Sequence, residues 1–167
     1  MIIDNCELWY VKLNPEKPEK SRDKDKPDYW TLQIRTTDKA VRDEWKEKNL
    51  NPKPVVPDEG EPYFKVNIRR KTVNASGKEA DCPDLIDGNL NPIDPDTVGN
   101  GSVGNVRIFQ YDYQNEFGTG IASVLMGCQL TKHILYTPQV GEEFAKATTE
   151  VVTPETKAMP EDEEDEY

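Results

Sequence analysis

Histidine and cysteine are scarce in this sequence, and long apolar runs are absent. Its three cysteines, Cys6, Cys82 and Cys128, are far apart and form no CxxC pair, which argues against a disulfide framework and against a zinc site. The single histidine, His133, has no nucleophile beside it, and we assign it no catalytic role. No segment has the apolar length of a membrane span, and residues 1–5 lack the basic start and apolar run of a signal peptide. We therefore predict a soluble protein of the reducing cytoplasm, with no metal and no cofactor.

The acidity of the chain is concentrated at its C-terminus. The formal net charge is −11, and residues 153–167 hold seven acidic residues and one lysine, a net of −6, so −5 is left for residues 1–152. The chain ends in Glu161, Asp162, Glu163, Glu164, Asp165, Glu166 and Tyr167. Six adjacent like charges without apolar side chains cannot offset the entropy cost of ordering. We therefore predict a folded domain over residues 1–152 and a disordered acidic tail over residues 153–167.

The tail has two interpretations. Acidic termini often serve only to keep a protein soluble. The aromatic Tyr167 behind the carboxylates favours a short linear ligand instead, whose ring fills a pocket and whose charges meet a basic rim on a partner.

One segment has the opposite sign of charge. Residues 63–78 contain no acidic residue and five cations, namely Lys65, Arg69, Arg70, Lys71 and Lys78. Local fields decide which partners a face attracts, so this segment can attract an anion although the whole chain is acidic.

The pattern of apolar residues predicts a mainly β domain. Five segments have the alternation or the β-branched and aromatic content of strands: residues 7–13, 29–35, 63–73, 105–113 and 121–136. One helix is predicted up to about Leu50, because Thr37 or Asp38 can cap it and Trp45 lies on its apolar face. The connections are predicted at residues 14–28, 51–62 and 81–100. This order has no βαβ rhythm and favours a small closed or nearly closed barrel.

Two of the strands present polar or aromatic residues on the face opposite the core. Alternation places Phe64, Val66 and Ile68 inward and leaves Lys65, Arg69 and Lys71 outward, together with Tyr63 and Asn67. In the fourth strand, Val106 and Ile108 oppose Arg107, Phe109, Tyr111 and Tyr113. Cations for phosphates and flat rings for unpaired bases are what a nucleic-acid single strand needs.

Weaker candidates lie on the second strand. Trp30 faces inward with Leu32, while Tyr29 and Arg35 face outward. Alternation cannot assign Trp9, because apolar residues surround it on both faces. The aromatic stripe also has a competing interpretation, in which Phe109, Tyr111 and Tyr113 pack under the helix, under the loop over residues 81–100, or against a second subunit.

Two motifs that could indicate other chemistry have simpler explanations. The glycines of residues 99–104 precede a strand, and no Lys-Ser/Thr follows them, so they lead the chain tightly into that strand and do not form a phosphate loop. The acidic residues Asp84, Asp87, Asp94 and Asp96 do not have the spacing of a calcium loop, and turn chemistry explains them better.

Taken together, these features resemble the single-stranded DNA-binding proteins of T7-like phages. The resemblance covers residues 63–138, with the basic strand, the glycine-rich lead into the aromatic strand, the turn at Gly118 and Gly120 and the closing strand, and it includes the acidic tail with a terminal aromatic. It implies an oligonucleotide/oligosaccharide-binding (OB) fold, a five-stranded Greek-key barrel, that coats single-stranded DNA during replication, recombination and repair. It also implies a tail that docks on replication proteins such as polymerase or helicase, occupies the DNA groove when DNA is absent, and contributes to a homodimer.

Two other classes of function stay open at this point. An acidic interaction protein could use the aromatic stripe to bind another protein and its carboxylates to mimic DNA. A small nuclease could use the acidic cluster of residues 84–96 with magnesium, although no ligand set of recognisable spacing is present. The non-enzymatic binder of single strands is our leading hypothesis.

Overall fold

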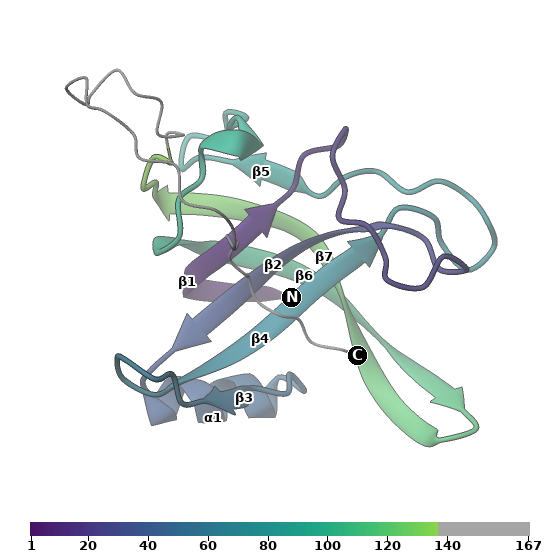
Figure 1. Cartoon of the computed structure of the whole chain (residues 1–167), viewed down its shortest axis with the longest axis horizontal. Helices are drawn as coiled ribbons and strands as arrows, with labels where there is room; N and C mark the ends of the chain where they lie inside the picture. The colour runs from purple at the N-terminus through teal and green to yellow at the C-terminus, as the bar shows by residue number, and fades with distance from the viewer. Residues whose placement is uncertain (137–167) are drawn as a thin grey trace, which may run out of the picture. The chain divides into compact units, whose positions relative to one another are not determined.

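The computed structural model describes residues 1–136. Within them the chain forms β1 (Ile2–Lys12), β2 (Tyr29–Thr36), α1 (Lys39–Glu47), β3 (Lys53–Val55), β4 (Tyr63–Lys71), β5 (Asp84–Ile86), a single 3₁₀ turn (Pro95–Thr97), β6 (Ser102–Asn115) and β7 (Gly118–Lys132), as drawn in Figure 1. The predicted tail, with all of its residues from Glu161 to Tyr167, lies outside the described residues.

Five long strands close into a barrel. The strands β4, β2, β1, β6 and β7 pair with their neighbours in this order, each pair antiparallel. A parallel contact between Arg69 of β4 and Val124 of β7 closes the ring. This is the path of the OB fold, so the prediction of a mainly β, five-stranded Greek-key barrel with one α-helix is confirmed for the described residues.

The barrel interior is filled by the side chains that alternation places inward. Trp30, Leu32 and Ile34 of β2 are buried, as predicted, and so are Val66 and Ile68 of β4. The indole Nε1 of Trp30 donates to the carbonyl of Asn14 at 3.0 Å, so the largest of these side chains has its polar atom satisfied. Further core residues come from β1, β6 and β7, and include Leu8, Val106, Ile108 and Leu125.

The helix α1 covers one end of the barrel beside β3 (Figure 1). Asp38, one of the two predicted candidates, caps it, because its carboxylate accepts the backbone N–H of Ala40 at 2.8 Å. Trp45 is buried in the core, and the carbonyl of Lys48 accepts from the side-chain amide of Gln110 in β6 at 2.7 Å. No described helix has the length and the apolar composition needed to cross a membrane.

The boundaries of several predicted elements were wrong. β1 begins at Ile2 and not at residue 7, because it pairs with β6 from Ile2 onward. The predicted linkers contain two short edge strands, β3 and β5, which are too short for a periodic pattern to show. Pro54 is tolerated within β3 because an edge strand does not need every N–H group. β7 ends at Lys132, four residues before the predicted end.

The β6–β7 hairpin is much longer than the barrel requires. From Gln110 to Asn115, β6 pairs with β7 and with no other described strand. Figure 1 shows this part of the hairpin projecting away from the barrel. The chain reverses at Gly118, whose φ of 124° is a conformation that favours glycine.

Two adjacent residues of β6 provide a test of the register that decides which of its side chains face the core. Ile108 is 2% exposed in the core, whereas its neighbour Phe109 is 58% exposed. We expect Ile108→Ala to lower the free energy of unfolding by about 2–5 kcal/mol, because it leaves a cavity. Phe109→Ala should change it by less than about 1 kcal/mol. Urea denaturation of both variants measures the difference, and equal losses would contradict the register.

Candidate nucleic-acid interface

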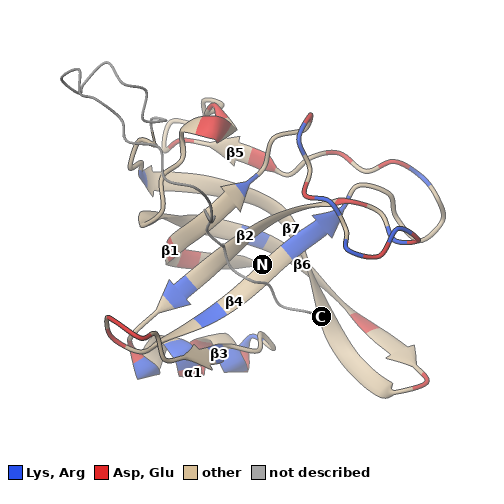
Figure 2. Cartoon of the chain, viewed as in Figure 1, with Lys and Arg blue, Asp and Glu red and all other residues tan. Residues whose placement is uncertain are grey.

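The outer face of β2 and β4 is basic and aromatic. The two strands pair from Tyr29 opposite Lys71 to Thr36 opposite Phe64, which puts their outward residues in one continuous array. The outward residues are Tyr29, Thr31, Gln33, Arg35, Tyr63, Lys65, Asn67, Arg69 and Lys71. Four of them are cations and none is a carboxylate, and Figure 2 shows blue bands on both strands with no red among them. The structure thus brings Tyr29 and Arg35 together with the predicted cations of β4.

One guanidinium on this face is held between aromatic rings. The Cζ atom of Arg35 lies 3.9 Å from the ring centroid of Trp9 in β1 and 4.3 Å from that of Tyr63 in β4. The ring of Tyr10 is 5.5 Å away. A planar guanidinium stacks well on such rings, and the stack leaves the N–H groups at its edge.

A second stack lies at the other end of the same face. The Cζ atom of Arg69 is 3.9 Å from the ring centroid of Tyr29, so a cation of β4 packs on the first residue of β2. Both side chains are half-buried. The two stacks place a ring beside a positive charge at both ends of the array.

A hydrogen-bonded chain of side chains connects the middle of the face. The amide Nε2 of Gln33 donates to Oδ1 of Asn67 at 2.8 Å, across β2 and β4. The Nε of Arg35 donates in turn to Oε1 of Gln33. Gln33 is only 6% exposed although it points outward, because its neighbours cover it.

An irregularity in β1 puts two successive rings on the same side. The pairing of β1 with β2 shifts between Trp9 and Lys12, and Tyr10 has a φ of 51°, in the left-handed region that a bulky side chain rarely adopts. Side chains that follow one another in a regular strand point to opposite faces. The bulge instead lets both Trp9 and Tyr10 approach the guanidinium of Arg35.

Asparagine side chains hold the irregular residues of β1. The backbone N–H of Tyr10 donates to Oδ1 of Asn100 at 2.8 Å. Asn5, with a φ of 61°, is held in the same way, because its N–H donates to Oδ1 of Asn105 at 3.0 Å. The glycine-rich segment before β6 was predicted only to lead into a strand, and its Asn100 has the additional role of fixing the bulge.

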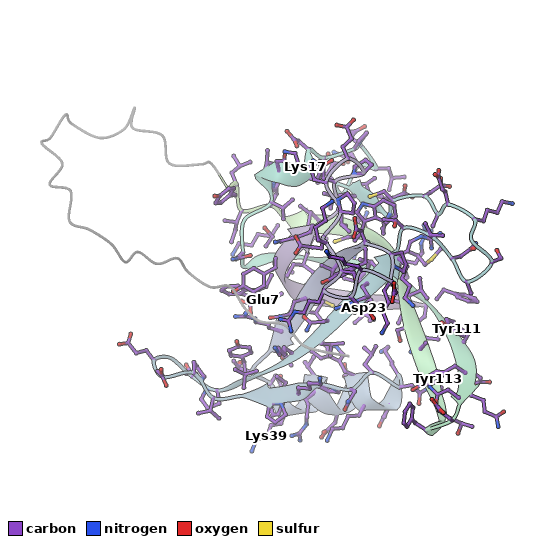
Figure 3. The ribbon with its side chains drawn as sticks, turned by 45° about the vertical axis from the view of Figure 1, so that its right-hand side comes forward. Glu7, Lys17, Asp23, Lys39, Tyr111 and Tyr113 are labelled. Carbon is purple, nitrogen blue, oxygen red and sulfur yellow. The ribbon has the colours of Figure 1, made fainter. Side chains whose placement is uncertain are left out.

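The predicted aromatic stripe lies on the projecting hairpin. Phe109 is 58%, Tyr111 47% and Tyr113 42% exposed, so no described part of the helix or of the loop over residues 81–100 buries the stripe. The rings of Phe109 and Tyr111 stack with centroids 6.3 Å apart. Tyr113 lies over Gly120 of β7, where an added Cβ would come within 2.8 Å of its ring. Figure 3 shows Tyr111 and Tyr113 on the hairpin, well apart from Glu7 of β1.

The aromatic stripe and the basic face adjoin each other, but β6 and β4 do not pair directly. Val124 of β7 pairs with Arg69 on one side and with Phe109 on the other. Two strand spacings separate Arg69 from Phe109, about 10 Å. Both therefore lie on the outer surface of the barrel, on either side of β7.

Arg107 lies on the same face of β6 as Phe109 and forms an ion pair. Its guanidinium Nη2 is 3.7 Å from the carboxylate of Asp84 in the segment that pairs with β7, and both side chains are largely exposed. An exposed ion pair of this kind contributes little to stability. It does reduce the positive charge next to the stripe, so a role of Arg107 in DNA binding stays a prediction.

The carboxylates of Asp87 and Asp94 serve turns, as predicted, whereas Asp84 lies in β5 and pairs with Arg107. The carboxylate of Asp87 accepts the N–H groups of Asn89 and Asn91, and that of Asp94 accepts the N–H of Asp96. Within residues 1–136, no three His, Cys, Asp or Glu side chains are grouped so as to hold a metal ion. Burial raises the pKa of the thiols of Cys6 and Cys128 to about 12, so both stay protonated at neutral pH.

Sequence reasoning missed several residues of this interface. Alternation places Tyr63 on the outward face of β4 beside the cations, so the sequence pattern could have identified it as a site residue. Alternation also places Gln33 outward with Arg35, but its role depends on its neighbours. Trp9 and Tyr10 had no such signal, because the bulge breaks alternation.

No protein-family model matches the chain, and no curated protein matches its sequence at a significant level. Solved structures do match its fold. The single-stranded DNA-binding protein of bacteriophage Enc34, in complex with single-stranded DNA, aligns with a TM-score of 0.56 and 15% identity over 78% of this chain and 85% of that one. The single-stranded DNA-binding protein gp2.5 of bacteriophage T7 aligns with a TM-score of 0.54 and 12% identity over 89% and 97%. The chain shares the fold of these phage proteins.

The two asparagines provide a matched test of the bulge. We expect Asn100→Ala and Asn105→Ala each to lower the free energy of unfolding by about 1 kcal/mol, because each removes the acceptor of one backbone N–H in β1. Only Asn100→Ala should weaken the binding of oligo-dT, because only Asn100 supports Trp9 and Tyr10. Urea denaturation and fluorescence anisotropy with a labelled oligonucleotide measure both effects. An equal loss of affinity in the two variants would separate the bulge from binding.

Proposed function

We propose that this protein binds single-stranded DNA through the outer face of β1, β2 and β4 and through the adjoining aromatic stripe of the β6–β7 hairpin. The observation that carries the proposal is the array on β2 and β4, with four cations and aromatic rings and no carboxylate on its outward positions. Phosphates need the cations, and unpaired bases need the rings.

The position of the array within the barrel supports this proposal. In OB folds, the face of the second and third strands and the loops after the first and fourth strands bind oligonucleotides. In this chain those elements are β2, β4, the loop over residues 13–28 and the β6–β7 hairpin. Two phage proteins of the same fold are single-stranded DNA-binding proteins, and one of them was solved with its DNA.

The biological setting that we propose is phage DNA replication, recombination and repair in the host cytoplasm. The protein acts without catalysing a reaction, as a coat for single strands. Residues 1–152 form the DNA-binding domain, and the acidic tail of residues 153–167 recruits replication proteins such as a polymerase or a helicase. The proposal also includes a homodimer formed partly by the tail.

Titration of the intact protein into fluorescein-labelled oligo-dT tests the proposal directly. Salt-sensitive binding that is stronger than binding to a duplex of equal length is the expected result. Absence of binding at low salt would leave the acidic interaction protein as the better hypothesis. Shortening of the strand when magnesium is present would indicate a nuclease instead.

The cations of β4 should provide phosphate contacts that do not depend on base sequence. We expect the double variant Arg69→Ala/Lys71→Ala to weaken binding to all single strands alike, and to reduce the slope of log K against log salt by about 0.7 for each lost contact. A matched control is Lys39→Ala/Lys46→Ala, which removes two exposed charges from α1. If the control loses as much affinity as the double variant, net charge and not the face of β4 is responsible.

The tail should compete with DNA for the basic face. Six adjacent carboxylates on a tether have a high effective concentration near these cations. Deletion of residues 161–167 should therefore tighten binding to oligo-dT, and most at low salt, where the competition is least screened. Tyr167→Ala should leave this competition nearly intact and impair only partner docking. Titration calorimetry of the three proteins at low and high salt measures the effect, and equal affinities at low salt would restrict the tail to solubility.

A further inference from the structure

We propose that the two aromatic regions have different roles, and that Arg35 is a clamp for a backbone phosphate which Gln33 positions. On this proposal the rings around Arg35 hold a cation, and the rings of the hairpin stack on bases. The inference rests on the proposed binding of single strands and adds which group each region contacts.

The rings beside Arg35 are already occupied. Its Cζ atom lies 3.9 Å from the centroid of Trp9 and 4.3 Å from that of Tyr63, which is the spacing of direct stacking. A ring face covered by a guanidinium at this distance has no room for a base on the same side. Tyr10 closes the edge of this group, with its ring centroid 5.9 Å from that of Trp9 at an interplanar angle of 66°. The group is therefore built around the cation.

The hydrogen bonds of Arg35 leave one edge of its guanidinium available. Its Nε donates to Oε1 of Gln33, and no acceptor within residues 1–136 contacts its two Nη groups. The guanidinium has a planar fork of N–H groups, and its Nη edge suits the oxygens of a phosphate.

Gln33 is suited to hold that orientation. It is more than nine-tenths buried, its Oε1 accepts from Arg35, and its Nε2 donates to Asn67 in the neighbouring strand at 2.8 Å. Both ends of its amide are thus hydrogen-bonded, and this holds the Nε edge of the Arg35 guanidinium in place. Gln33 does not itself reach a ligand, so it is a positioning residue.

The hairpin rings differ in all of these respects. Phe109, Tyr111 and Tyr113 are 42–58% exposed, and no cation–π contact involves them within the described residues. Their faces are accessible to bases, and stacking on a base is tolerant of sequence. This contrast is the basis for assigning bases to the hairpin and a phosphate to Arg35.

Two ligands of equal length separate the two roles. Oligo-dT has bases and phosphates, and an abasic deoxyribose phosphate oligomer has phosphates alone. We expect Gln33→Leu and Arg35→Lys each to weaken binding about tenfold on both ligands. Arg35→Lys keeps the charge and the fold but loses the planar fork. Tyr111→Ala should weaken binding to oligo-dT about tenfold and leave the abasic oligomer unchanged.

A double-mutant cycle distinguishes positioning from a general structural effect. If Gln33 acts through Arg35, then Gln33→Leu should cost no further affinity in a protein that already carries Arg35→Leu. Additive losses would overturn the positioning role. Losses with Arg35→Lys that occur on oligo-dT and not on the abasic oligomer would overturn the phosphate clamp, and this test holds even if Gln33→Leu does not fold. Failure of the unmodified protein to bind oligo-dT would instead refute the proposed function itself.

Discussion

The basic face of β2 and β4 adjoins the aromatic stripe of β6 only because the barrel is closed. In the open sheet order, β2 and β1 lie between the basic strand β4 and the aromatic strand β6. The parallel contact of Arg69 with Val124 brings β7 beside β4, so that only one strand separates the two sets of side chains. The candidate interface therefore arises from topology, since β4 and β6 are distant in sequence and do not pair.

Two arginines of the outer face pack on aromatic rings, and several lysines elsewhere form exposed ion pairs. Lys12, Lys17 and Lys20 lie within 3.1–3.6 Å of carboxylates, as is common for exposed lysines. Arg35 packs against the rings of Trp9 and Tyr63, and Arg69 packs against the ring of Tyr29. A ring attracts a cation without neutralising its charge. A carboxylate in the same place would stabilise the arginine equally well and would weaken its attraction for a phosphate.

Local pattern predicted those parts of the fold that local forces determine. The alternation of Trp30, Leu32 and Ile34 gave the core face of β2, and Asp38 gave the start of the helix, because both depend on nearby residues. The same alternation placed the basic and aromatic sets outward. The placement of Trp9 and Tyr10 could not be predicted, because the bulge that turns them depends on Asn100, 90 residues away in sequence. Short edge strands such as β5 form only because β7 is there to pair with them.

The asparagines that support β1 also constrain the order in which the chain folds. Asn5 and Tyr10 adopt left-handed backbone conformations that an isolated strand would avoid, and their N–H groups are satisfied by side chains 100 and 90 residues later. β1 therefore cannot adopt its final shape until the segment that leads into β6 has been made. Closing so long a loop carries a large entropy cost before any contact repays it. β1 should consequently be structured late, and the stacked arginine with it, so that the interface is completed only when the whole domain has folded.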